Sequence, residues 1–149
     1  MRRVEIFKNG WQFERNGICR DHIRIPHDWA IEGPFTQNND CQFTRIVADG
    51  ETHAQPHYGR TGGLPHVGKA VYRKSFFLSF GNQGKKVRFE FDGIMSHSEI
   101  FVNGHKIAER PYGYSSFCGD ASDAVRFGAE NQLEVHVDNP AFSSRWYPG

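Results

Sequence analysis

The chain has 149 residues, of which 38% are hydrophobic and 14% aromatic, and its 18 basic and 17 acidic residues give a formal net charge of +1. Charges of both signs are interspersed, so the sequence lacks the basic footprint that a nucleic acid backbone or an anionic membrane surface requires, and it holds no apolar run of about 18 residues. We therefore expect neither nucleic acid nor membrane as a partner, and one soluble domain whose aromatic-rich composition favours short, half-buried strands.

The first strand-like segments are separated by a long polar passage. WQFER (Trp11–Arg15) predicts a short strand, and AVYRKSFFL (Ala70–Leu78) predicts another that ends in a turn at Gly81–Gly84. Between Pro34 and Lys69 only CQFTRIV (Cys41–Val47) looks extended. A passage this long without firm elements is uncommon in a compact domain and is usually functional or mobile.

The second half of the chain has clearer patterns. KVRFEFDG (residues 86–93) alternates apolar and charged residues, as a strand with one wet face does, and QLEVHVDN (132–139) repeats this rhythm. Two extended runs, 99–102 and 105–109, flank an Asn-Gly pair and predict a β-hairpin. The only helix signal is a single capped turn within 120–128. Many short strands with almost no helix predict an all-β sandwich.

Metal and phosphate sites are not expected. His53, His57 and His66 lie in the polar passage, but Pro56 opposes the helix that would align the first two as ligands, and no cysteine or carboxylate completes a set. The glycine-rich stretch 59–69 fits neither nucleotide-binding spacing, and no GxSxG motif marks a nucleophile. We therefore predict no catalytic residue, no metal and no cofactor.

The three cysteines are odd in number and far apart, which predicts buried or incidental thiols rather than a disulfide framework or a zinc site. They are Cys19, Cys41 and Cys118. The compartment stays open: the chain as written suits the cytoplasm, and removal of an upstream export signal would make it periplasmic or secreted.

Three segments combine aromatic and hydrogen-bonding side chains: PHDWAIEGPF (Pro26–Phe35), RPYGYSSF (Arg110–Phe117) and SSRWYPG (Ser143–Gly149). Sugar recognition uses this combination, because the apolar face of a pyranose stacks on a flat ring while its hydroxyls need fixed donors and acceptors. Aromatic residues that close a sandwich core give the same pattern. Sugar contact and core packing both remain open for these segments.

Six segments in order resemble the N-terminal domain of glycoside hydrolase family 2 enzymes, most of all the β-galactosidase branch: PHDWAIEGPF, GGLPHVGKAVYRKSF, FEFDGIMSHSEIFVNG, RPYGYSSF, ENQLEVHVDN and SSRWYPG. The resemblance covers essentially the whole chain. It implies one sugar-binding-type domain over residues 1–149, a jelly-roll β-sandwich of the galactose-binding-like type that lacks its final strand.

In this family the nucleophile and the general acid are glutamates of a separate (β/α)8 barrel, which follows an immunoglobulin-like domain, and the reaction retains the anomeric configuration. Neither later domain is contained in the 149 residues. The resemblance therefore implies a chain that is catalytically inert by itself.

The resemblance also implies a binding role for two loops, which in the family form part of the wall of the substrate pocket. They map here to Met95, Ser96, His97, Ser144, Arg145 and Trp146. Some members carry an Asn in the first loop and an Asp in the second that bond galactose, and Met95 and Ser144 stand near those positions without supplying the same bond. Val71 replaces a usual aromatic residue, which we expect to change packing or pocket shape.

The partners implied are a β-galactoside in the full-length enzyme and the remaining domains of that enzyme, with a homo-oligomer left open. Three alternatives stand beside this reading. One is a free-standing carbohydrate-binding module that stacks sugars on Trp29, Tyr112, Trp146 and Tyr147. Another is a scaffold whose loops pack on protein. The third is the same domain from a β-glucuronidase or a β-mannosidase, because the first domain carries little of the determinant for substrate choice.

Overall fold

The computed structural model describes residues 3–32, 42–57 and 68–139. Their contacts divide them into two compact units. The first unit takes its described residues from 3–27 and 68–139, and the second from 28–32 and 42–57. Apart from two short 3-10 turns, every regular element in this part of the chain is a strand, which confirms the all-β prediction.

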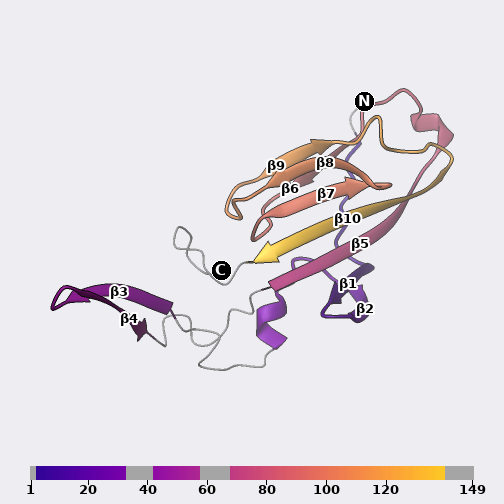
Figure 1. Cartoon of the computed structure of the whole chain (residues 1–149). Coiled ribbons are helices and arrows are strands. Elements are labelled where there is room, and N and C mark those ends of the chain that lie inside the picture. The colour runs from indigo at the N-terminus through magenta and orange to yellow at the C-terminus, as the bar shows by residue number, and fades with distance from the viewer. Residues whose placement is uncertain (1–2, 33–41, 58–67, 140–149) are drawn as a thin grey trace. The chain divides into compact units, whose positions relative to one another are not determined.

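The first unit is built on one large antiparallel sheet. Its six strands follow the order β2-β1-β5-β10-β7-β8. They are β1 (Trp11–Arg15), β2 (Ile18–Ile23), β5 (Gly68–Leu78), β7 (Ser98–Val102), β8 (His105–Arg110) and β10 (Ala129–Asn139). The two long strands β5 and β10 lie side by side over their whole length and form the centre of the sheet (Figure 1).

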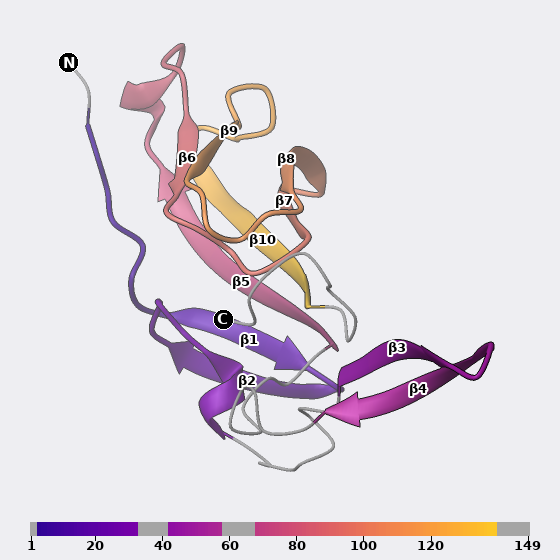
Figure 2. The same cartoon turned by 90° about the vertical axis from the view of Figure 1, so that its left-hand side faces the viewer.

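A second, two-stranded sheet is formed by β6 (Arg88–Phe91) and β9 (Phe117–Asp120). Aromatic rings connect the two sheets: Phe89 of β6 lies 5.4 Å from Phe76 of β5, measured between ring centroids. Phe7 lies 5.7 Å from Phe76, and it belongs to residues 3–10, which run as an extended stretch into β1 (Figure 2). The Phe76 and Phe89 rings meet edge to face and the Phe7 and Phe76 rings are tilted, and aromatic pairs at these distances attract beyond their buried area, so the cluster contributes to packing between the sheets.

The alternation predicted for the strands is confirmed by burial. On β10, Leu133, Val135 and Val137 are at most 5% exposed, while the residues between them face the other side of the sheet. On β7, Ile100 and Val102 are fully buried. These strands therefore turn one face to the core and one to solvent, as period-two alternation requires.

A buried asparagine fixes the turn between β7 and β8 to the start of β10. Asn131 is 1% exposed, and its Oδ1 accepts hydrogen bonds from Nδ2 of Asn103 at 2.8 Å and from the backbone N–H of Arg126 at 2.7 Å. Its Nδ2 donates to the carbonyls of Arg126 and Ala129. Asn103 has a φ of 50° in the predicted hairpin turn and also donates to the carbonyl of Ala124. All polar atoms of Asn131 are thus satisfied.

The single capped turn predicted within 120–128 is present, and it does not extend into a helix. The carbonyl of Ala121 accepts bonds from the N–H groups of Ala124 and Val125, and the pattern is not repeated. Asp120 caps this turn, since its Oδ1 accepts bonds from the backbone N–H and the hydroxyl of Ser122. An isolated turn of this length has too few bonds to propagate.

The second unit contains a 3-10 turn, η1 (Trp29–Glu32), and a hairpin of β3 (Gln42–Ala48) and β4 (Glu51–His57). Asp49 and Gly50 connect the strands with φ values of 54° and 81°, the left-handed geometry of a tight turn. The polar passage is therefore more ordered than its composition predicts. The final strand that the resemblance implies to be lacking would come after SSRWYPG, and residues 140–149 themselves lie outside the described residues.

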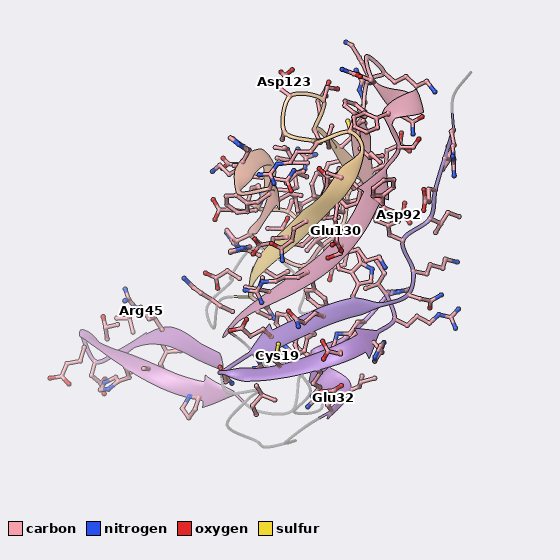
Figure 3. The ribbon with its side chains drawn as sticks, turned by 90° about the vertical axis from the view of Figure 1, so that its right-hand side faces the viewer. Cys19, Glu32, Arg45, Asp92, Asp123 and Glu130 are labelled. Carbon is pink, nitrogen blue, oxygen red and sulfur yellow. The ribbon has the colours of Figure 1, made fainter. Side chains whose placement is uncertain are left out.

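Two cysteines are described, and both are free and exposed. Cys19 lies on β2, away from the loop between β9 and β10 that carries Asp123 (Figure 3). The sequence predicted buried or incidental thiols, and the two described thiols are not buried. Cys41 lies outside the described residues. In the described ranges no helix is long and apolar enough to cross a membrane.

Candidate functional site

The first predicted pocket-wall segment is the loop 92–97, which leaves β6 at Asp92 (labelled in Figure 3) and enters β7. Ser96 in this loop is 2% exposed. Its Oγ donates to the carbonyl of Asp138 at 3.1 Å, and its own carbonyl accepts from the N–H of Asp138 at 3.1 Å. The peptide bond between Met95 and Ser96 is cis. Two hydrogen bonds in opposite directions therefore attach the loop to the end of β10.

The same loop packs on a second one, residues 111–116. The N–H of His97 donates to the carbonyl of Pro111 at 3.2 Å. A Cβ on Gly113 would lie 2.5 Å from Sδ of Met95, and a Cβ on Gly93 would lie 2.6 Å from the carbonyl oxygen of Gly113. Only glycine at both positions allows the two backbones to approach this closely.

His97 presents the polar group of the loop to solvent. It is exposed and has a φ of 40°, a conformation in which histidine is enriched among residues with a Cβ. Its Nδ1 lies 3.2 Å from Oγ of Ser96, and the same Oγ lies 3.1 Å from the carbonyl oxygen of Asp138, which can only accept. With the single hydroxyl proton donated to that carbonyl, Nδ1 is the donor to Oγ, and we assign this tautomer to His97. In the neutral ring this leaves Nε2 as a hydrogen-bond acceptor at the surface.

The neighbouring loop 111–116 adds aromatic surface. The rings of Tyr112 and Tyr114 lie 5.8 Å apart, and Tyr114 is 54% exposed. Nη2 of Arg110 donates to the hydroxyl of Ser115 at 3.3 Å. A ring face and a hydrogen-bond acceptor thus lie on two loops in direct contact, and this pair of chemical features suits a pyranose.

Val71 lies on the outward face of the large sheet, not in the core between the sheets. Its partners in register are Glu14 on β1 and His136 on β10. On this face Arg73 forms ion pairs with Glu14 and Glu134, and the hydrogen bond that Arg73 donates to Glu14 contributes most to raising the pKa of Arg73. Val71 is therefore not part of the sandwich core, and any change in packing or pocket shape caused by the missing aromatic ring would concern this charged outer surface.

The second predicted segment, Ser144, Arg145 and Trp146, lies outside the described residues. The structure describes the preceding chain as far as Asn139. Asp138 stands six residues before Ser144 in the sequence. The structure therefore describes one of the two predicted loops, and it attaches that loop to the strand that leads towards the other.

The histidines of the polar passage do not gather into a ligand set within the described residues. His53 on β4 is exposed, and its Nε2 lies 3.8 Å from a carboxylate oxygen of Glu51. His66 and the side chain of His57 lie outside the described residues. No group of three or more histidine, cysteine or acidic side chains in the described ranges could hold a metal ion.

Asp138, Gly93 and Gly113 belong to the site but were not predicted. The glycines stand inside motifs that mark the loops, FDG and YGY, so a close approach of backbones could have been suspected there. Asp138 bonds to Ser96 only through its backbone atoms, and no pattern of side chains in the sequence indicates such a bond.

Comparison with known proteins assigns the family. No family model matches the chain. A β-galactosidase of Bacteroides ovatus, BoGH2A, is 40% identical over 145 residues, which cover 95% of this chain and 15% of that protein. A solved glycosyl hydrolase family 2 member from Bacteroides cellulosilyticus matches 96% of the chain at 32% identity with a TM-score of 0.70, and the match covers 18% of that structure. The chain is an N-terminal domain of glycoside hydrolase family 2.

This family 2 domain also matches a putative β-glucuronidase of Formosa agariphila, at 33% identity over 97% of the chain and 14% of that protein. The chain thus spans about one seventh of the length of the curated relatives it matches. The family 2 domain corresponds to a small part of much larger enzymes, and their names include two kinds of β-glycosidase.

Proposed function

We propose that this domain serves a retaining β-galactosidase as a non-catalytic part of the substrate-pocket wall and as an interface to the remaining domains. The observation that carries the proposal is the 40% identity to a β-galactosidase along nearly the whole chain, in a match that covers only 15% of that enzyme. The family places the two catalytic carboxylates on a later barrel. The domain therefore contributes binding and shape rather than chemistry.

Within the domain, His97 is the residue we assign to direct sugar contact, together with Ser144, Arg145 and Trp146 of the second loop. His97 is exposed, and Nδ1, not Nε2, contacts Ser96, so Nε2 can accept a hydrogen bond from a sugar hydroxyl. Met95 instead packs against Gly113. A contact of this kind holds substrate and transition state alike, so its loss raises KM more than it lowers kcat.

Two assays test the proposal. The purified 149-residue chain should give no turnover of nitrophenyl β-galactoside, and turnover that survives repurification would refute the non-catalytic role. The chain is then exchanged for the matched segment of the Bacteroides ovatus β-galactosidase, where it should support galactoside hydrolysis. In that hybrid His97→Ala should raise KM about tenfold, the effect of one hydrogen bond to a buried ligand.

The matched control is His105→Ala. His105 is also exposed, but it starts β8 at the opposite end of β7 from His97. Equal KM values for the two variants would contradict the assignment of His97.

A second candidate is a β-glucuronidase parent, which the match to the Formosa agariphila protein favours. The same hybrid decides between the two readings through its ratio of kcat/KM for galactoside and glucuronide. If substitutions at His97 affect only glucuronide hydrolysis in a matching hybrid with a β-glucuronidase, the parent is a glucuronidase.

A further inference from the structure

We infer that Ser96 is a positioning residue of the pocket wall: its hydroxyl holds the His97 ring and the end of β10 in one fixed arrangement and does not itself touch the sugar. The inference rests on the proposed function of the loop 92–97. The family resemblance alone would assign Ser96 to direct contact with the sugar, and the inference gives it a positioning role instead.

Burial and hydrogen bonding carry the argument. Ser96 is 2% exposed, so its hydroxyl is not available to a ligand. That hydroxyl lies 3.1 Å from the carbonyl oxygen of Asp138, to which it donates, and 3.2 Å from Nδ1 of His97, from which it accepts in the tautomer assigned above. A serine hydroxyl can do both at once, because it has one proton and two lone pairs. The same oxygen therefore sets the tautomer of His97 and joins the loop to β10.

The attachment to β10 extends the effect along the chain. Asp138 is bonded to Ser96 through both its N–H and its carbonyl, and one residue later β10 ends. The chain then continues towards Ser144, in the second segment assigned to the wall. Ser96 thus sits where the first segment meets the end of β10.

Ser98, two residues away, provides a matched control. It is 1% exposed, and its Oγ donates to a backbone carbonyl, that of Arg110, at 3.2 Å. Both serines are therefore buried, and each donates a hydrogen bond from its hydroxyl to a backbone carbonyl. Its bond leads to β8, and it has no histidine partner among the described contacts. Ser96→Ala and Ser98→Ala should cost similar stability while only the first disturbs the wall.

The first test uses the isolated chain and is independent of catalysis. In wild type, 15N NMR of the imidazole should show His97 protonated on Nδ1; in Ser96→Ala the ring should shift towards the Nε2-protonated form, because its acceptor is gone. The amide of Asp138 should exchange its hydrogen at least about tenfold faster in Ser96→Ala. Ser98→Ala should change neither signal. An unchanged tautomer and exchange rate in Ser96→Ala would overturn the role of Ser96.

The second test uses the galactosidase hybrid. Ser96→Ala should raise KM about threefold to tenfold with kcat within about twofold, and Ser98→Ala should leave KM unchanged. When His97 is already alanine, the effect of Ser96→Ala on KM should fall to less than half, since residues that act through one another are not additive. Full additivity, or equal KM for the two serine variants, would overturn the inference. No effect of His97→Ala would instead overturn the proposed function, even where the NMR result stands.

Discussion

Replacing Asn131 by leucine should remove the polar connection between β10 and the loop before it. The substitution keeps a side chain of similar size but deletes the two acceptor bonds from Asn103 and Arg126 and the two donor bonds to Arg126 and Ala129. A buried donor left without an acceptor costs about 1–3 kcal/mol, and two donors lose Oδ1 here. Better burial of the leucine offsets about 1 kcal/mol of this. The net loss should be roughly 3 kcal/mol, a large share of a typical domain stability.

Urea unfolding followed by tryptophan fluorescence measures this loss, because Trp11 is buried at 4% exposure. With a slope near 2 kcal/mol per molar, the midpoint should fall by about 1.5 M. Gln132→Ala, at an exposed neighbour on the same strand, should change stability by no more than about 0.5 kcal/mol. If Asn131→Leu behaved like this control, the hydrogen bonds of Asn131 would not be what orders the loop, and the reasoning would be refuted.

Three further predictions concern the loops and the surface. Gly113→Ala should destabilise the chain by about 1–3 kcal/mol in the same urea assay, because its Cβ would overlap Met95, whereas a Cβ on Gly81 lies 3.8 Å from Oγ of Ser79, an ordinary contact, so Gly81→Ala should stay near wild type. Hydrogen bonds from the Ser122 hydroxyl and then its N–H hold the pKa of Asp120 below its usual 3.8, so the stabilisation is present above that pH and lost as pH falls through the folded-state pKa. Ser122→Ala should raise the pKa of Asp120 in a carboxyl NMR titration and reduce the loss of stability at acid pH. An unchanged pKa of Asp120 would contradict this prediction. Cys19 should react with Ellman's reagent in the native chain, and Cys19→Ser should remove one rapidly reacting thiol.

Strands with one buried face were predictable from the sequence. The bounds of β1 agree with the prediction from WQFER, and on β10 the alternation identified the buried valines. β2 was missed because its six residues, ICRDHI, are almost all exposed and leave no apolar period to detect. β9 was missed because four residues that include a glycine give too short a pattern.

The site was predictable only in part, for a different physical reason. Motifs pointed to the loop of Met95, Ser96 and His97, and the structure describes that loop. They could not reveal its attachment to Asp138, because both bonds involve backbone atoms of Asp138, 42 residues away, and almost every residue carries the same N–H and carbonyl. Which of the three residues faces solvent was likewise decided by the path of the backbone.

The edge strand β2 has a consequence for how the chain behaves among its own copies. An edge strand exposes unpaired backbone groups that can recruit a strand from another molecule. β2 has charged residues at Arg20 and Asp21, a left-handed backbone at His22 with a φ of 61°, and a register shift against β1. Charge, a local kink and a broken register each discourage a flat intermolecular pairing. At high concentration this edge should therefore resist fibril growth by strand addition.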